Sequence, residues 1–112
     1  SQNEDGFIKG VLGIDLDVEQ GYNAARQCGI SLLAQLKNAV NGDLNKVTKV
    51  VKLGGFVNSA PDFTDQPSVI NGASDLLVEL FGEKGRHART AVGANLPLGV
   101  AVEIDGIFEV ES

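Results

Sequence analysis

The sequence has few of the residues from which disulfides, metal sites and membrane spans are built. It holds one cysteine and one histidine among 112 residues, and no tryptophan. The single cysteine, Cys28, excludes an internal disulfide and a multi-cysteine metal site, and it fits a reducing, cytoplasmic location. His87 alone cannot supply a metal cluster. Because the apolar stretches are too short to span a bilayer, we expect no membrane association.

Positive charge is also scarce. Nine Lys and Arg residues stand against fifteen Asp and Glu residues, which gives a formal net charge of −6. This excess of negative charge repels a phosphate backbone, so we expect no nucleic-acid partner. The other proportions, 43% hydrophobic and 21% charged residues, are typical of a globular protein, and we expect one domain over residues 1–112.

Two segments have the periodicity of amphipathic helices. The first starts at Asp17, which forms a capping-box pattern with Gln20, and apolar residues then recur at three- and four-residue steps as far as Val40. The second is predicted between Asp65 and Gly82, where apolar residues follow a similar stripe and the glycine supplies a stop.

Strands are predicted at 47–57, which is rich in β-branched residues, and at 89–94. A third is predicted at 100–110, where apolar and acidic residues alternate. Gly54-Gly55 indicates a bulge or a close backbone approach. The glycine-punctuated segment 6–13 predicts a short strand or ribbon. This β-α-β-α-β-β order favours an α+β sandwich with two helices on one face of a sheet. The other face, if apolar, needs a cover that self-association would provide.

Phosphate loops, nucleophile elbows and zinc motifs are absent from the sequence, which leaves Arg89 and Glu103 as candidates. They lie on consecutive predicted strands, which a hairpin could bring together. Arginine binds a planar carboxylate bidentately and glutamate can hold or activate a water, so the pair suits a small 2-keto or 2-imino acid. A structural salt bridge across two strands needs the same two residues, and on spacing alone it is the commoner outcome.

The segments 85–93, 96–97 and 102–104 resemble the C-terminal signature of the RidA/YjgF family, also known as the endoribonuclease L-PSP family. In that signature, Ala-Arg-Ser-x-Val is followed by Leu-Pro and by a Val/Ile-Glu-Ile/Val strand. The resemblance extends over nearly the whole chain and begins at Ser1-Gln2, so the family's opening β-strands have no counterpart in this sequence. Ala91, where many members have cysteine, and a longer loop at 59–68 indicate a divergent subgroup.

The resemblance implies a chorismate-mutase-like α+β fold and a homotrimer with clefts between subunits. It implies that Arg89 binds the substrate carboxylate and that Glu103 positions the hydrolytic water, and it places Asn71 in a neighbourhood that lines the cleft. Active members of the family hydrolyse imines and enamines to 2-keto acids and ammonia without metal or organic cofactor. Two alternatives are a non-catalytic trimer that binds a small carboxylate as a ligand sensor, and an endoribonuclease or translation inhibitor, against which the net charge argues.

Two further side chains have simple structural interpretations. A single unclustered histidine such as His87 is more often a strand-end or surface residue than a ligand-binding one. Cys28 lies beside the buried stripe of the first helix, where a free cysteine usually behaves as a small hydrophobic residue. We therefore expect neither to take part in catalysis.

Overall fold

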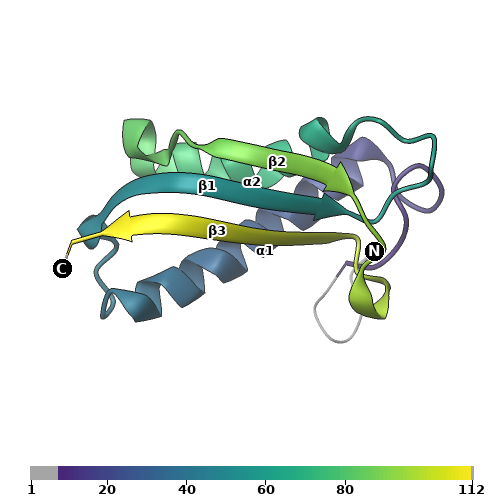
Figure 1. Ribbon diagram of the computed structural model, residues 1–112. Coiled ribbons are helices and arrows are strands. Elements are labelled where there is room, and N and C mark those ends of the chain that lie inside the picture. Colours follow the sequence, from purple (N-terminus) through teal and green to yellow (C-terminus); the bar gives the residue numbers. More distant parts are fainter. Residues whose placement is uncertain (1–7, 112) are drawn as a thin grey trace.

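The protein is described by a computed structural model that covers residues 8–111 (Figure 1). It has two α-helices and three β-strands, which are α1 (Val18–Ala39), β1 (Val47–Val57), α2 (Gln66–Phe81), β2 (Ala88–Gly93) and β3 (Val102–Val110). Short 3-10 segments lie between α1 and β1, between α2 and β2, and between β2 and β3. Both helices lie behind the same face of the sheet, which confirms the expected α+β architecture (Figure 1).

The sheet has the order β2-β1-β3, with β1 parallel to β2 and antiparallel to β3. The expectation that β2 and β3 form a hairpin is therefore wrong, because β1 lies between them. The ribbon predicted at 6–13 is also reduced: Lys9 bridges to Val100 and Leu12 to Ser59, without a continuous strand. Residues 6 and 7 of that prediction lie outside the described part of the chain.

Local sequence signals account for the ends of the helices. At the start of α1, the Asp17 carboxylate accepts a hydrogen bond from the backbone N–H of Gln20, and the Gln20 side chain accepts one from the backbone N–H of Asp17. This is the predicted capping box. The chain leaves α1 through Asn41 and Gly42, both at positive φ, and α2 ends at Gly82 with φ 62°. Neither described α-helix has the length and apolarity that a membrane crossing requires.

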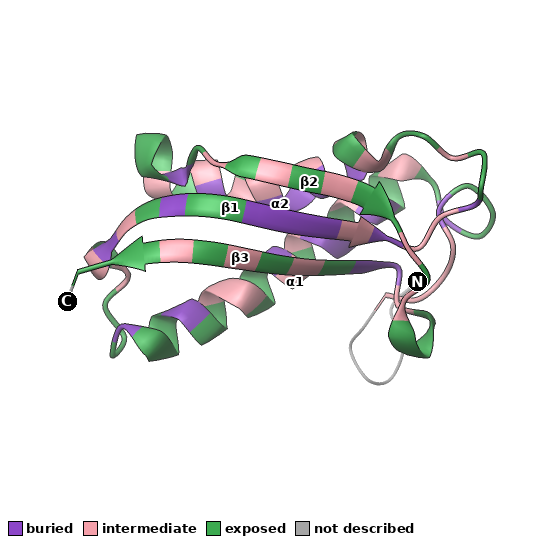
Figure 2. Ribbon diagram, viewed as in Figure 1, coloured by how far each residue is buried: buried purple, intermediate pink, exposed green. Residues whose placement is uncertain are grey.

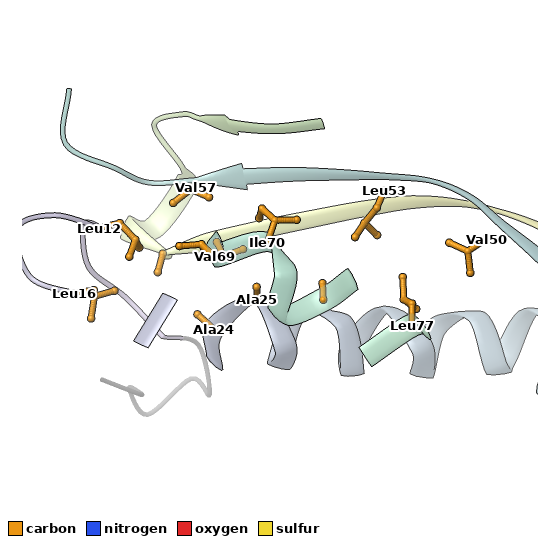
Figure 3. Close-up of a cluster of buried hydrophobic side chains, with 13 residues drawn as sticks. Leu12, Leu16, Ala24, Ala25, Val50, Leu53, Val57, Val69, Ile70 and Leu77 are labelled. Atoms are coloured by element: carbon orange, nitrogen blue, oxygen red, sulfur yellow. The ribbon is translucent and has the colours of Figure 1, made fainter. Parts of the chain in front are cut away.

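The core lies between the helices and the sheet (Figure 3). Leu53 of β1 and Ile70 and Leu77 of α2 are among its fully buried side chains. The predicted close approach at Gly54-Gly55 is confirmed, because a Cβ added to Gly55 would lie 2.6 Å from Ile70. The bulges that the same pair suggested occur earlier in β1, at 47–49 and 50–52. Glycine at 55 thus lets α2 pack directly on the central strand.

The opposite face of the sheet has no cover among residues 8–111 (Figure 2). Residues paired across the sheet share a face, so the alternation along β1 and β3 places Glu103, Asp105 and Ile107 on this open face. Ile107 is 60% exposed, and Val92 of β2, paired with Phe56, is 41% exposed. The open face is therefore partly apolar and partly acidic.

Candidate functional site

Arg89 links the edge strand of the sheet to α2. It pairs with Leu53 in the register of β1 and β2, so its side chain points to the face that the helices cover. Nη1 donates hydrogen bonds to Oδ1 of Asn71 (2.7 Å) and to Oγ of Ser74 (3.1 Å), and Nη2 donates to the carbonyl of Pro67 (3.3 Å). The guanidinium is thus held along the first turns of α2, and Asn71, predicted from the resemblance, lies beside it.

These contacts leave part of the guanidinium available. Of its five N–H donors, three are used by Asn71, Ser74 and Pro67. The hydrogen on Nε and one on Nη2 have no partner within residues 8–111. Two adjacent donors on a fixed planar group are what a bidentate contact with a carboxylate requires.

Ser74 also connects Arg89 to His87. Nδ1 of His87 lies 2.5 Å from the carbonyl of Gly85, and a carbonyl can only accept, so Nδ1 carries the hydrogen. In the neutral ring Nε2 is then an acceptor, and it lies 2.9 Å from Oγ of Ser74. Ser74 therefore donates its hydroxyl hydrogen to His87 while it accepts a hydrogen bond from Arg89.

A surface pocket of about 240 Å³ adjoins these side chains, between α2 and the start of β2. Its lining residues are Ser74, Val78, Arg86, His87 and Arg89, none of which is acidic. Arg86 forms an exposed ion pair with Glu83 (3.0 Å), which does not line the pocket. The pocket therefore concentrates positive charge within a chain of net charge −6 and suits a small anion.

Glu103 lies away from this pocket. It pairs with Phe56 on the open face, whereas Arg89 lies on the helix-covered face, and β1 separates their two strands. Within residues 8–111 no ion pair joins the two side chains, so the alternative of a cross-strand salt bridge does not hold within one chain. Glu103 instead borders a larger groove of about 370 Å³ between α1 and β3, next to Cys28 and Ile104.

Cys28 behaves as the small hydrophobic residue that the sequence suggested. It packs against the core and lies with Sγ 3.4 Å from the carbonyl of Val102. Burial, with a smaller contribution from the negative charge of Glu103, raises the pKa of the thiol to about 11. The thiol therefore stays protonated near neutral pH and is a poor nucleophile.

Ser74 was not predicted from the sequence, and His87 was expected to have only a structural role. A signal for both was present: Asn71 and Ser74 are three residues apart on one helix, and His87 and Arg89 are two apart along one extended segment. Such spacings place each pair on one face of its element. What the sequence did not supply was the packing of α2 against β2 that brings the two faces together.

Among residues 8–111, no group of three or more His, Cys, Asp or Glu side chains is arranged to hold a metal ion.

Comparisons with known proteins identify relatives over most of the chain. A family described as "YjgF/chorismate mutase-like, putative endoribonuclease" matches residues 3–103. "Protein TCP17" of Trypanosoma cruzi is 51% identical over 109 residues, which are 96% of this chain and 68% of that protein. The crystal structure of Atu1372 from Agrobacterium tumefaciens, a protein of unknown function, has a TM-score of 0.94 at 49% identity and covers 98% of this chain and 72% of that one. A "putative endoribonuclease" from Shewanella oneidensis has a TM-score of 0.82 at 37% identity, and the match covers 88% of this chain and 66% of that one.

Proposed function

The chain belongs to the YjgF/chorismate-mutase-like family, and from that premise we propose that it is a hydrolytic deaminase of reactive 2-imino and enamine acids. The observation that carries the proposal is the guanidinium of Arg89, held by Asn71 and Ser74 with two donors left beside a small cationic pocket. The products are a 2-keto acid and ammonia.

The chemistry follows from binding the substrate by its carboxylate. In a 2-imino acid the electrophilic carbon is bonded directly to the carboxylate carbon, so a carboxylate on Arg89 fixes that carbon inside the pocket. Water adds to this carbon to form a carbinolamine, which expels ammonia and leaves the keto acid. A protonated imine is itself electrophilic, so the proposal includes neither a metal nor an organic cofactor.

The proposal includes a homotrimer with active-site clefts between subunits. The open face of the sheet supports it, because the exposed side chains of Ile107 and Val92 gain from being covered by another copy. Arg89 and Glu103 lie on opposite faces of one chain. A site in which Glu103 positions the water therefore takes the two residues from different subunits.

A direct test follows the decay of 2-aminoacrylate released by a dehydratase. We expect the purified protein to accelerate formation of pyruvate and ammonia in proportion to its concentration. Decay at the uncatalysed rate, with a correctly folded protein, would contradict the proposal.

The second candidate is a non-catalytic trimer that binds a small carboxylate. The separation of Glu103 from Arg89 within one chain favours it, because a carboxylate site formed by Arg89 alone needs no water-positioning group. Calorimetry with a panel of 2-keto acids distinguishes the two: binding without turnover of the imines selects the binding protein.

RNA is not part of the proposed function, although the matching family and the Shewanella protein carry the word endoribonuclease in their descriptions. The net charge of −6 opposes binding of a phosphate backbone. Cleavage of RNA that follows the protein through successive columns would contradict the exclusion of RNA from the function.

We also propose a cytoplasmic location, because the thiol of Cys28 is free and free thiols persist in a reducing compartment.

A further inference from the structure

Ser74 lies at the centre of a chain of hydrogen bonds that connects His87 to Arg89. Its hydroxyl donates to Nε2 of His87 (2.9 Å), its oxygen accepts from Arg89 (3.1 Å), and the Gly85 carbonyl fixes the tautomer of His87. A hydroxyl bonded to an imidazole that a third group orients is a recurrent arrangement for moving protons in enzymes. Ser74, His87 and Arg89 all line the same pocket.

We propose that Ser74 and His87 are the acid–base pair of this site, with Ser74 relaying a proton between the attacking water and Nε2 of His87. The inference rests on the proposed deaminase function and deepens it. Glu103 of the same chain lies on the other face of the sheet, so Ser74 and His87 are the proton-transfer groups that adjoin Arg89 within one chain.

The position of Ser74 fits this role because its oxygen is bonded to the group that binds the carboxylate. A hydroxyl oxygen has two lone pairs, and the Nη1 hydrogen of Arg89 uses one of them. The second is available to accept a hydrogen bond from water. A substrate held by the remaining donors of Arg89 would lie in the pocket that Ser74 and His87 also line, with its electrophilic carbon one bond beyond the carboxylate.

The proton balance closes over the two halves of the reaction. In the first half, water adds to the carbon of the protonated imine, the C=N bond becomes a single bond, and one water proton passes through Ser74 to Nε2 of His87. The products of this half are a neutral carbinolamine and an imidazolium whose Nδ1–H still donates to Gly85. In the second half, the imidazolium returns the proton through Ser74 to the amino nitrogen. Ammonia leaves as the C=O bond forms, and it takes the hydroxyl proton to become ammonium.

The test compares turnover with ligand binding in Ser74→Ala and His87→Gly. The imine is generated in situ by an amino-acid oxidase, ammonia release gives kcat, and calorimetry gives the affinity for pyruvate. Loss of an acid–base group lowers rates by about 10²- to 10⁴-fold, so we expect kcat to fall by that order in both variants while pyruvate affinity stays near the wild-type value. Added imidazole should restore part of the activity of His87→Gly, because the pocket is open to solvent.

Ser68→Ala is the matched control. Ser68 lies on the same helix and donates to Asp65 (2.6 Å), but it does not line the pocket. It loses the same kind of hydrogen bond and should keep wild-type kcat. Melting and sedimentation of all variants verify that they fold and assemble as the wild type does.

Three results would overturn the inference while leaving the deaminase function intact: wild-type kcat in Ser74→Ala, a parallel loss of pyruvate affinity and turnover, or failure of imidazole to restore activity. A parallel loss would mean that Ser74 only positions Arg89. If the wild-type protein itself releases no ammonia above the uncatalysed rate, the proposed function fails, and the inference fails with it.

Discussion

Replacing Arg89 by alanine removes two kinds of contact at once. One is the proposed contact between its remaining donors and a substrate carboxylate. The other is the set of three hydrogen bonds that tie β2 to α2 through Asn71, Ser74 and Pro67. The structure therefore predicts a loss of ligand affinity together with a measurable loss of stability.

The two effects have different sizes. A hydrogen bond to a charged group contributes about 1.5–3 kcal/mol, so affinity for a 2-keto acid should fall roughly ten- to a hundred-fold. The three bonds to α2 involve a half-exposed side chain, and we expect their loss to lower the free energy of unfolding by about 1–2 kcal/mol. Arg89→Lys keeps the charge without the planar fork, so it should recover stability more than affinity.

Calorimetry with pyruvate and thermal melting are measured on the same preparations. Arg26→Ala is the matched control, because Arg26 also bonds to α2, through Glu79 (2.8 Å), but does not line the pocket. It should leave pyruvate affinity unchanged. If Arg89→Ala is destabilised and yet binds pyruvate as the wild type does, Arg89 has only a structural role and the proposed site is wrong.

Three further predictions concern stability and assembly. Because burial raises the pKa of Cys28 from 9.0 to about 11, the unfolded chain ionises first as the pH rises, and stability should fall between these values by up to about 1.4 kcal/mol per pH unit. The free energy of unfolding is measured by denaturant titration at each pH, and in Cys28→Ala it should lack the part of the pH dependence that comes from the thiol. An equal dependence of this free energy on pH in both proteins would refute the prediction. Gly72→Ala forces a Cβ against the backbone carbonyl of Tyr22, whereas Gly29→Ala meets the flexible end of Leu76 at 3.0 Å. Gly72→Ala should lower the free energy of unfolding by about 1–3 kcal/mol, and by more than Gly29→Ala does. The reverse order would contradict the close packing of α1 on α2 at Gly72. Sedimentation should show a trimer at micromolar concentration, and a monomer of 11.7 kDa would exclude the proposed clefts.

The elements that follow from short-range patterns could be predicted from the sequence. The ends of α1 are set by Asp17 and Gln20 at one end and by Asn41-Gly42 at the other, and all of these signals act within a few residues. The alternation in β3 likewise shows directly which residues share a face. These features need no knowledge of how distant segments pack.

The order of the strands could not be predicted in the same way. Consecutive strands usually pair with each other, and this preference favoured a hairpin between β2 and β3. In the structure β1 pairs with both, parallel to β2 along one edge and antiparallel to β3 along the other. The contact of Ser74 with His87 depends on this long-range arrangement, which explains why residue spacing alone did not reveal it.

The most direct measurement of the central claim compares two imines in one assay: a 2-imino acid, and the corresponding 2-imino amide, which lacks the carboxylate. We expect the protein to accelerate ammonia release from the 2-imino acid. We expect this acceleration to be largely lost for the amide, because Arg89 then has no anion to bind. Equal acceleration of both imines would contradict recognition through Arg89, and acceleration of neither would contradict the proposed deaminase activity.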